Sequence, residues 1–440
     1  MDLSRLDGLR GCGGAGFPAA FKWNAVRDEP LVGTPETGGG KVIVCNADEG
    51  EPGTFKDGWL FREQPEVVLR GMQRAAEFSN AARGYVYLRP EYVEQLESLK
   101  AAIQALVQAG VLSEGSGAVW AGAGFAGRPA KPHDTGLDDV ALSALDWFVE
   151  HGAQALEGSV TEHGGLATGH AFGEGLAFPL TPQFSDPVTP ASATGVAFRV
   201  DICIGGGAYI CGEETALLES MEGKRPQPRH KPPFPTSSGL WGLPTLMNNV
   251  ETFWWAERLL SGDFAGEGGT HRLYSLSGDV NQPGVYEAPV GISAKDLVEQ
   301  FGGGVKGGAD VSCWIPGGAA TGVLPGSLLD TPLSSEGLKE VGTAPGTAAV
   351  VIFALRDPRE VAASIMQFFA QESCSQCTPC RLGCRAVASW LQGSSAFPDA
   401  DTEERWLESM ELGSICGLGF TAPLVLRLWR RWFSENGVAV

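Results

Sequence analysis

The sequence predicts an α/β protein of three parts: a Rossmann-like α/β domain over residues 1–250, a β-grasp domain with its linker over 251–356 and a helix bundle over 357–440. Strand and helix patterns alternate in the first part, which favours a parallel sheet. In the second part, two strands joined by a short turn precede a helix. The third part has helical periodicity throughout. At 440 residues the chain is long enough for several domains.

The alternation begins with a β-branched strand at the start of 41–57, which runs into a loop rich in glycine and carboxylates. A helix is predicted over 65–80, a strand over 84–89 and a second helix over 91–109, where apolar residues recur three and four positions apart. In a parallel sheet of this kind, ligands bind beyond the carboxyl ends of the strands. We therefore expect the loop after the first strand to border a binding site.

Residues 113–195 interrupt this pattern, because they are rich in Gly, Pro, Ala and Ser. We interpret them as an insertion made mostly of loop, with one helix near 138–155. A strand, a glycine turn and a helix that begins near Glu213 follow over 198–226. The histidines of the insertion match no usual metal-site spacing, so we interpret them as solvated loop residues: His133, His151, His163 and His170.

The second half of the chain opens with a loop over 225–252 that is too rich in proline for an element of the core. Residues 271–304 predict two strands joined by the turn NQPG, followed by a helix. Further strands are predicted within 308–325 and over 348–355. Together these segments resemble a small β-grasp module.

The composition indicates which partners to exclude and in which cellular compartment the protein is expected. The formal charge of −20 leaves no basic stripe for nucleic acid, so we expect no nucleic-acid partner. No run of about 18 apolar residues is present, so no membrane span is expected. The N-terminus lacks the apolar core of a signal peptide. We therefore expect a cytoplasmic protein, whose ten cysteines are reduced rather than paired.

The strongest chemical signal is the cysteine-rich stretch ESCSQCTPCRLGC. Cys374, Cys377 and Cys380 are spaced C-x₂-C-x₂-C, which is typical of a [4Fe–4S] cluster. There are two candidates for the fourth ligand. Cys384 completes a ferredoxin-like run, and Cys416 lies in GSICGLG. Zinc is the alternative metal, but zinc sites usually pair two separate C-x₂-C units. We therefore favour iron–sulfur over zinc.

Three loops form a second signal. The first has the pattern G-x-G-x-x-G over residues 11–16, with Lys22 shortly after it. The second carries amide and acidic side chains after the first strand, and the third leads from three glycines into the helix near Glu213. Glycine N–H groups and helix N-termini suit a phosphate, while amides and carboxylates suit sugar hydroxyls and ring N–H groups. No strand precedes the first loop, so we do not interpret it as a Rossmann dinucleotide turn.

These segments together resemble one family. GLRGCGGAGFPAAFKW, CNADEGEPGTFKD, GAYICGEETALLESMEGKRPQPRHKPPFP, GLWGLPTLMNNVET and ESCSQCTPCRLG with SICGLG are similar to motifs of the NADH-binding flavoprotein subunit of respiratory complex I. Diaphorase subunits of NAD-linked hydrogenases and formate dehydrogenases belong to the same family. The motifs follow the family order from residue 8 to about 419, and only 113–195 lacks a counterpart. The resemblance implies three ligands: FMN, NAD(H) and one [4Fe–4S] cluster.

The resemblance also assigns residues to each ligand. The FMN would contact residues of the three loops and of the segment after them: Gly11, Gly13, Gly14, Lys22, Asn46, Asp48, Glu49, Tyr209, Gly212, Glu213, Asn248 and Asn249. The NADH cleft would be lined by Phe17, Lys22, Glu51, Glu214, Lys231 and Phe234. The cluster ligands would be Cys374, Cys377, Cys380 and Cys416, which leaves Cys384 as a packed thiol. Residues 271–332 would form the family's β-grasp domain.

The implied activity is that of an NADH dehydrogenase of the NADH:quinone oxidoreductase type. NADH would pass a hydride to FMN, and single electrons would then pass to the cluster. No side chain need act as a general acid or base, and Glu51 and Glu214 would position the nucleotide. The chain would be the electron-input module of a larger complex, peripheral on the inner face of the membrane. Its implied partners are a [2Fe–2S] thioredoxin-like subunit and a larger iron–sulfur or catalytic subunit.

Two alternatives stay open at this stage: the same module in a formate dehydrogenase or hydrogenase, and a flavin-free iron–sulfur relay subunit. Three departures from the family pattern accompany them. Several tens of residues usually precede the glycine loop, so either the sequence is truncated or a partner-contacting segment is absent. Cys12 stands where the family usually carries arginine. Ala25 stands where some members carry an aromatic ring, which predicts weaker nucleotide binding.

Overall fold

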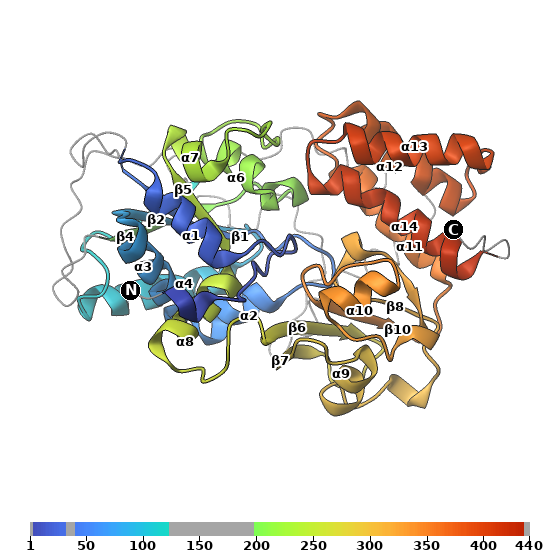
Figure 1. Ribbon diagram of the computed structural model, residues 1–440, viewed down its shortest axis with the longest axis horizontal. Coiled ribbons are helices and arrows are strands. Elements are labelled where there is room, and N and C mark those ends of the chain that lie inside the picture. Colours follow the sequence, from blue (N-terminus) through green and yellow to red (C-terminus); the bar gives the residue numbers. More distant parts are fainter. Residues whose placement is uncertain (1–2, 32–39, 123–197, 435–440) are drawn as a thin grey trace. The chain divides into compact units, whose positions relative to one another are not determined.

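The computed structural model describes residues 3–31, 40–122 and 198–434 (Figure 1). These residues form two compact units. The first unit takes the described residues of 1–50, 57–126 and 162–270, and the second takes 51–56 together with the described residues of 271–440. The predicted helix near 138–155 and all four histidines of the predicted insertion lie outside the described residues.

The first unit is built on a five-stranded parallel sheet in the order β3-β4-β2-β1-β5. Near its centre, Cys45 pairs with Val86 on one side and with Asn248 on the other. All the strands point the same way, so their carboxyl ends meet at one edge. This arrangement confirms the predicted Rossmann-like fold. The strands are β1 (Val42–Ala47), β2 (Arg83–Leu88), β3 (Val119–Ala121), β4 (Arg199–Ile204) and β5 (Thr245–Asn249).

Two of these strands correct the prediction from sequence. β5 lies within 225–252, where we expected no element of the core, yet Thr245–Asn248 are buried. Pro244 is the last proline before β5, and its carbonyl accepts a hydrogen bond from the Val42 N–H at 3.0 Å. The residues of β5 itself include no proline, so each can donate a backbone hydrogen bond to the neighbouring strand. β3 lies within 113–195, where we expected an insertion made mostly of loop, and it adds an edge strand beside β4.

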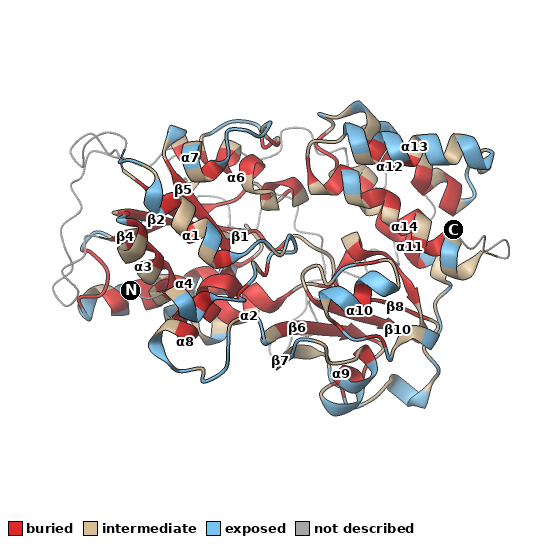
Figure 2. Cartoon of the chain, in the orientation of Figure 1, coloured by how far each residue is buried: buried red, intermediate tan, exposed pale blue. Residues whose placement is uncertain are grey.

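Helices cover this sheet, and Figure 2 shows its strands almost entirely in the colour of buried residues. The most extensive helix–helix contact of this unit is between α3 and α8. Gly71 allows it, because a Cβ there would lie 2.0 Å from the carbonyl oxygen of Phe253. The helices are η1 (Leu3–Leu6), α1 (Ala19–Asp28), α2 (Lys56–Glu63), α3 (Pro65–Ser79), α4 (Val93–Gln108), η4 (Tyr209–Gly212), α6 (Glu214–Met221), α7 (Pro235–Ser238), η5 (Leu240–Gly242) and α8 (Val250–Ser261).

The second unit begins with a mixed five-stranded sheet in the order β7-β6-β10-β8-β9. β6 and β7 form the predicted hairpin, and β10 runs parallel to β6 and antiparallel to β8. Its strands are β6 (His271–Gly278), β7 (Gly284–Pro289), β8 (Cys313–Ile315), β9 (Leu324–Pro325) and β10 (Ala349–Phe353). Its helices are α9 (Ala294–Gln300), η6 (Lys306–Gly308), η7 (Ala319–Thr321), η8 (Gly326–Leu328) and α10 (Ser335–Glu340). This is the β-grasp-like module that the sequence predicted.

Four helices complete the second unit, as the periodicity of 357–440 predicts. They are α11 (Pro358–Glu372), α12 (Thr378–Gln392), α13 (Ala400–Gly413) and α14 (Gly417–Phe433). α11 packs against α12 and α14, while α13 contributes mainly Leu407 and Met410 to the interior and is otherwise largely exposed (Figure 2). The compact first unit extends to Thr270 and so includes α8, whereas the predicted bounds 1–250, 251–356 and 357–440 place α8 in the second domain. Those bounds stay a prediction.

Candidate functional site

The glycine loop of residues 11–16 lies against the junction of β5 and α8. The Cys12 N–H donates to Thr252 Oγ1 at 3.0 Å, and a Cβ on Gly13 would come within 3.3 Å of the Asn249 Cβ. Gly14 has a φ of 105°, which a residue with a side chain rarely adopts. A Cβ at Gly16 would meet nothing within 4 Å, so the loop is open on that side. Among the described residues, the 3-10 helix η1 precedes this loop.

The carboxyl end of β1 brings the second loop against the third. The Asn46 Nδ2 donates to the Gly212 carbonyl at 2.8 Å, and the Asn46 Oδ1 accepts from the Asp48 N–H at 3.1 Å. A Cβ on Gly212 would lie 3.1 Å from the Asp48 carbonyl oxygen, so the two backbones touch. Tyr209, which begins η4, lies in the same contact, since a Cβ on Gly50 would be 3.3 Å from its ring. Loops distant in sequence therefore meet here.

Glu49 is committed to contacts within the protein. Its buried carboxylate accepts from the N–H groups of Asp57 at 2.9 Å and Gly58 at 3.0 Å, and from the Tyr92 hydroxyl at 2.6 Å. These donors are the second and third N–H groups of α2 and the hydroxyl of a buried tyrosine. Glu49 thus satisfies orphan donors of the helix N-terminus. Sequence reasoning assigned Glu49 to FMN and did not identify this capping role.

The adjacent glutamates of the third loop have different environments. Glu213 is the N-cap of α6, and its carboxylate accepts from the N–H groups of Thr215 at 2.8 Å and Ala216 at 2.9 Å. Glu213 also contacts Lys231 Nζ at 3.2 Å, whereas Glu214 binds two ammonium groups, Lys22 Nζ at 2.9 Å and Lys231 Nζ at 3.0 Å. Burial raises the pKa of the Glu214 carboxyl, but the two lysines outweigh burial and lower this pKa to about 2. Glu214 is therefore ionised at neutral pH.

Exposed aromatic rings accompany these charges. Phe17 is 49% exposed and Phe234 is 54% exposed, although both are large and apolar. Phe21, one turn after Phe17 and next to Lys22, is 64% exposed, and the two ring centroids are 5.5 Å apart. Sequence reasoning missed Phe21; the Phe-x₃-Phe spacing at the start of α1 was the available signal. Exposed rings at a polar rim indicate a surface on which a planar group can stack.

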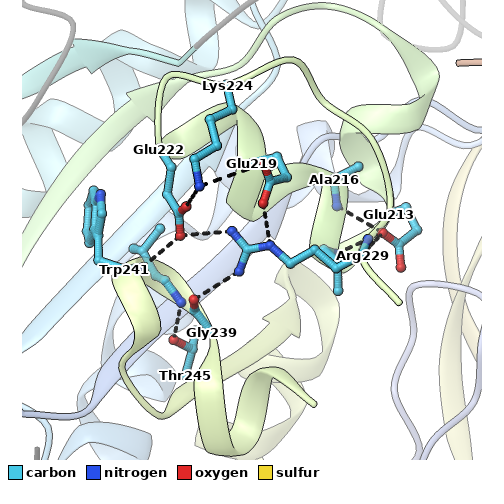
Figure 3. Close-up of polar contacts among 11 residues, drawn as sticks. Glu213, Ala216, Glu219, Glu222, Lys224, Arg229, Gly239, Trp241 and Thr245 are labelled. Atoms are coloured by element: carbon cyan, nitrogen blue, oxygen red, sulfur yellow. Dashed lines mark hydrogen bonds and ion pairs between the residues drawn. The ribbon is translucent and has the colours of Figure 1, made fainter. Parts of the chain in front are cut away.

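The loop that carries Lys231 and Phe234 is held by an ion network drawn in Figure 3. The Arg229 guanidinium contacts the carboxylates of Glu219 and Glu222 and donates to the Gly239 carbonyl at 3.1 Å. The Glu222 carboxylate also accepts from the Trp241 N–H at 2.8 Å. Two acidic residues of α6 and its C-terminus thus hold a proline-rich loop in one shape. A preorganised loop loses less conformational entropy when a ligand binds.

The two asparagines at the end of β5 close this edge of the sheet. Asn248 is buried, and Asn249 is the N-cap of α8, where its Oδ1 accepts from the Glu251 N–H at 3.0 Å. The Asn249 Nδ2 also donates to an Asp57 carboxylate oxygen at 2.5 Å. The glycine loop, Lys22, the loop after β1 and the third loop therefore meet near the carboxyl ends of β1 and β5. Glycine N–H groups, an ammonium, amides and carboxylates are a donor and acceptor set that fits a flavin phosphate, ribityl chain and ring.

Glu51 is placed in the second unit rather than with the other residues assigned to NADH. Its carboxylate accepts from the Ala320 N–H at 2.7 Å, and a Cβ on Gly318 would come within 2.6 Å of the Glu51 Cγ. The same segment is fixed further on by a hydrogen bond of 2.6 Å between the hydroxyls of Thr54 and Thr347. No pattern in the sequence indicated these contacts.

The cysteines assigned to the cluster lie at the starts of two helices. Cys377 is the N-cap of α12 and Cys416 is the N-cap of α14. The Ile415 N–H donates to the Cys377 Sγ at 3.4 Å, and a Cβ on Gly419 would lie 2.9 Å from the Cys380 Cβ. The two helix starts are therefore in contact. Cys374, Cys380 and Cys416 are buried and Cys377 is partly exposed.

Cys384 lies one turn after Cys380 and is fully buried. A hydrogen bond from Cys384 lowers the pKa of the Cys380 thiol to about 7, against the opposing effect of burial. Within the described residues, no three His, Cys, Asp or Glu side chains are close enough together to hold a single metal ion. Sulfur donors at two converging helix N-termini fit an anionic iron–sulfur cluster. The assignment of Cys416, rather than Cys384, as the fourth ligand stays a prediction.

The helices of the described residues include none with the length and apolar content needed to cross a membrane.

Three protein families match consecutive parts of the chain. The family described as the Nuo51 FMN-binding domain matches residues 5–257, the SLBB domain matches 272–338, and the iron–sulfur binding region of NADH-ubiquinone oxidoreductase-F matches 360–438. These matches agree in order with the two sheets and the helix bundle described above.

Curated relatives match over nearly the whole chain. The second of two F subunits of NADH-quinone oxidoreductase in Rhizobium meliloti is 33% identical over 100% of this chain and 88% of its own length. The corresponding F subunit of Rhodobacter capsulatus is 33% identical over 99% of this chain and 86% of its own, and that of Escherichia coli is 33% identical over 86% and 68%.

A solved structure, NAD⁺-reducing [NiFe]-hydrogenase in the H₂-reduced state, is also similar. It matches with a TM-score of 0.71 and 30% identity over 99% of this chain. The match spans only 61% of that hydrogenase chain.

Proposed function

The chain belongs to the family of NADH-quinone oxidoreductase F subunits, and from that premise we propose that it oxidises NADH with bound FMN and delivers electrons singly to a [4Fe–4S] cluster. One observation carries the proposal. The same chain holds a glycine- and carboxylate-rich site at the carboxyl edge of a parallel sheet and a set of thiols at two helix N-termini. The first suits a flavin and a nucleotide, and the second suits an iron–sulfur cluster.

The first unit supplies the flavin site. We propose that N–H groups of the glycine loop and the amides of Asn248 and Asn249 bind the phosphate end, because backbone N–H groups at a helix start attract anions. Asn46 and Asp48 border the ribityl chain and ring edge. When bound, FMN supplies a hydride acceptor that can release single electrons. The protein residues bind and orient the FMN, and none of them need transfer a proton.

The charged trio of Lys22, Glu214 and Lys231 is proposed to bind the nicotinamide nucleotide. The ionised Glu214 carboxylate accepts from ribose hydroxyls, and the lysines bracket it and attract the pyrophosphate. Phe17 and Phe234 offer stacking faces for the ring systems. Glu51, which belongs to the second unit, stays a predicted nucleotide contact that rests on the resemblance.

The second unit is proposed to hold the cluster with Cys374, Cys377, Cys380 and Cys416. Thiolates and an iron–sulfur core carry net negative charge, and the N-termini of α12 and α14 supply positive partial charge to it. Burial of three of these sulfurs limits access of water and oxidants to the cluster.

A larger assembly is proposed for this module. Its partners would be a [2Fe–2S] thioredoxin-like subunit and a larger iron–sulfur or catalytic subunit, with the chain held peripherally at the inner face of the membrane through them. The structural match to a hydrogenase favours one alternative, in which the same module serves an NAD-linked hydrogenase. Co-purification of the tagged chain and identification of the bound subunits distinguishes the two assemblies.

The core proposal is tested on protein purified without oxygen. We expect released FMN and iron in a ratio of about one to four, a cluster absorbance bleached by NADH, and reduction of ferricyanide by NADH. A cluster spectrum without flavin and without NADH oxidation would overturn the proposal and favour a flavin-free relay subunit.

A further inference from the structure

Two serine hydroxyls lie in the immediate surroundings of the proposed cluster ligands, and neither was identified from the sequence. Ser373 is buried, and its Oγ is 3.4 Å from the Cys380 Sγ. It ends α11, so the helix that packs against α12 sets its position. Because a thiolate ligand can only accept, this hydroxyl donates to the sulfur once Cys380 binds iron.

Ser414 is the second hydroxyl. Its Oγ is buried and has no hydrogen-bond partner among the described residues. A Cβ placed on Gly419 would lie 2.3 Å from this Oγ and 2.9 Å from the Cys380 Cβ, so both groups border the same glycine. Ser414 also precedes the Cys416 ligand by two residues. A buried hydroxyl without an acceptor is costly, which indicates that its acceptor is a group bound at this point.

A backbone N–H group is a third hydrogen-bond donor near the proposed ligands. The Ile415 N–H donates to the Cys377 Sγ at 3.4 Å. The three donors come from the end of α11 and from the residues just before α14, and they converge on the segment that carries the Cys377 and Cys380 sulfurs. Hydrogen bonds to cluster sulfurs favour the reduced form, because that form carries one more negative charge.

We propose that the Ser373 and Ser414 hydroxyls raise the reduction potential of the cluster by donating hydrogen bonds to its ligand sulfurs or core. This inference rests on the proposed function, and it assigns to the serines a tuning role rather than ligation. A cluster with a higher potential is a better electron acceptor, so the hydroxyls favour electron transfer towards the cluster.

The test is an EPR-monitored redox titration of the anaerobically purified full chain and its variants. We expect Ser373→Ala and Ser414→Ala each to make the midpoint potential more negative. The double variant is expected to shift the reduced-to-oxidised equilibrium about tenfold, or ~59 mV for a one-electron couple. The matched control is Ser389→Ala on α12, whose hydroxyl pairs with Ser395 instead, and it is expected to keep the wild-type potential.

Variants that keep the hydroxyl separate tuning from packing. Ser373→Thr and Ser414→Thr are expected to retain the wild-type potential, and they decide the matter if an alanine variant fails to assemble a cluster. An unchanged potential in both alanine variants with an intact EPR signal would overturn the inference while leaving the proposed function standing. Absence of a cluster signal from the wild-type chain would overturn both.

Discussion

At the scale of single residues, Glu213 and Glu214 are adjacent in sequence and yet have different roles. Glu213 accepts from the first N–H groups of α6 through its Oε2, and its Oε1 contacts Lys231 Nζ at 3.2 Å. Glu214 is directed to two lysines that come from α1 and from the proline-rich loop. Glu213 is the N-cap and has extended backbone, which lets its carboxylate reach the first N–H groups, whereas Glu214 is already helical.

Glu214→Gln is expected to weaken NADH binding about tenfold, because the neutral amide is a weaker acceptor for the ribose hydroxyls and no longer pairs with the ammonium groups of Lys22 and Lys231. The measurement is the Kd for NADH by titration of the flavin absorbance or fluorescence. The matched control is Glu97→Gln, whose ion pair with Lys100 is 2.8 Å long but whose side chain is 70% exposed. An unchanged Kd for Glu214→Gln would contradict the assignment of Glu214 to the nucleotide.

The effect of the same variant on the free energy of unfolding is expected to depend on pH. The pKa of Glu214 in the folded protein is about 2, below the ordinary value of 4.5, so its ion pairs contribute fully to stability above about pH 4.5. Their contribution is lost as the pH falls towards 2. We expect wild type to exceed Glu214→Gln in free energy of unfolding by ~1–3 kcal/mol from neutral pH to about 4.5, with the gap shrinking below. Urea unfolding across this pH range measures the difference in free energy of unfolding. A difference that widened on acidification would contradict the lowered pKa of Glu214.

At the scale of elements, the starts of α12 and α14 make the proposed cluster site together. Each helix has a cysteine as its N-cap, and neither cap side chain accepts a hydrogen bond from its own helix. The helices therefore present sulfur where most helices present a capping oxygen. Their close approach depends on Gly419, which lies between Ser414 and Cys380.

Gly419→Ala is expected to prevent assembly of the cluster, because the new Cβ would lie 2.9 Å from the Cys380 Cβ and force the two helix starts apart. Gly417→Ala is the matched control on the same helical turn, since a Cβ there would meet nothing within 4 Å. Iron content and visible absorbance of the two anaerobically purified variants make the comparison. Equal iron in both variants would show that the contact at Gly419 is not required.

At the scale of the whole molecule, the chain passes between its two compact units more than once. Residues 51–56 join β1 to α2 of the first unit but belong to the second. There the Phe55 N–H donates to Ser275 Oγ at 3.1 Å, and Gly53 fits beside Val351, where a Cβ would lie within 2.8 Å of Cγ2. This short segment is thus built into the β-grasp sheet.

We therefore expect cleavage of the chain shortly before residue 270 to leave the two fragments associated. A protease site inserted between Ala265 and Gly266, in an exposed loop, would divide the chain into fragments that elute as one species in native buffer. The reason is that residues 51–56 remain bound within the second unit. Size-exclusion chromatography before and after cleavage measures the outcome, and urea added to the cleaved sample is the control that the peptide bond was cut. Separation in native buffer would contradict the expectation.

Much of the architecture followed from the sequence because it depends on local patterns. Hydrophobic periodicity predicted α3, α4 and the C-terminal helices, and the alternation of strand and helix predicted the parallel sheet. β5 was missed because the prolines before it masked a short strand whose place is decided by pairing with β1. Strand pairing is a non-local interaction, and composition over a window cannot report it.

The sequence by itself determined which residue types are present and in what spacing: the three evenly spaced cysteines, the glycine loop and the paired glutamates. Only the tertiary structure decided which side chains meet. It committed Glu49 to the cap of α2, set Glu214 between two lysines, placed Glu51 in the second unit and brought Ser373 and Ser414 close to Cys380, a proposed cluster ligand. The physical reason is that hydrogen bonds and ion pairs act over a few ångströms in space, whereas most of these partners lie far apart in the chain.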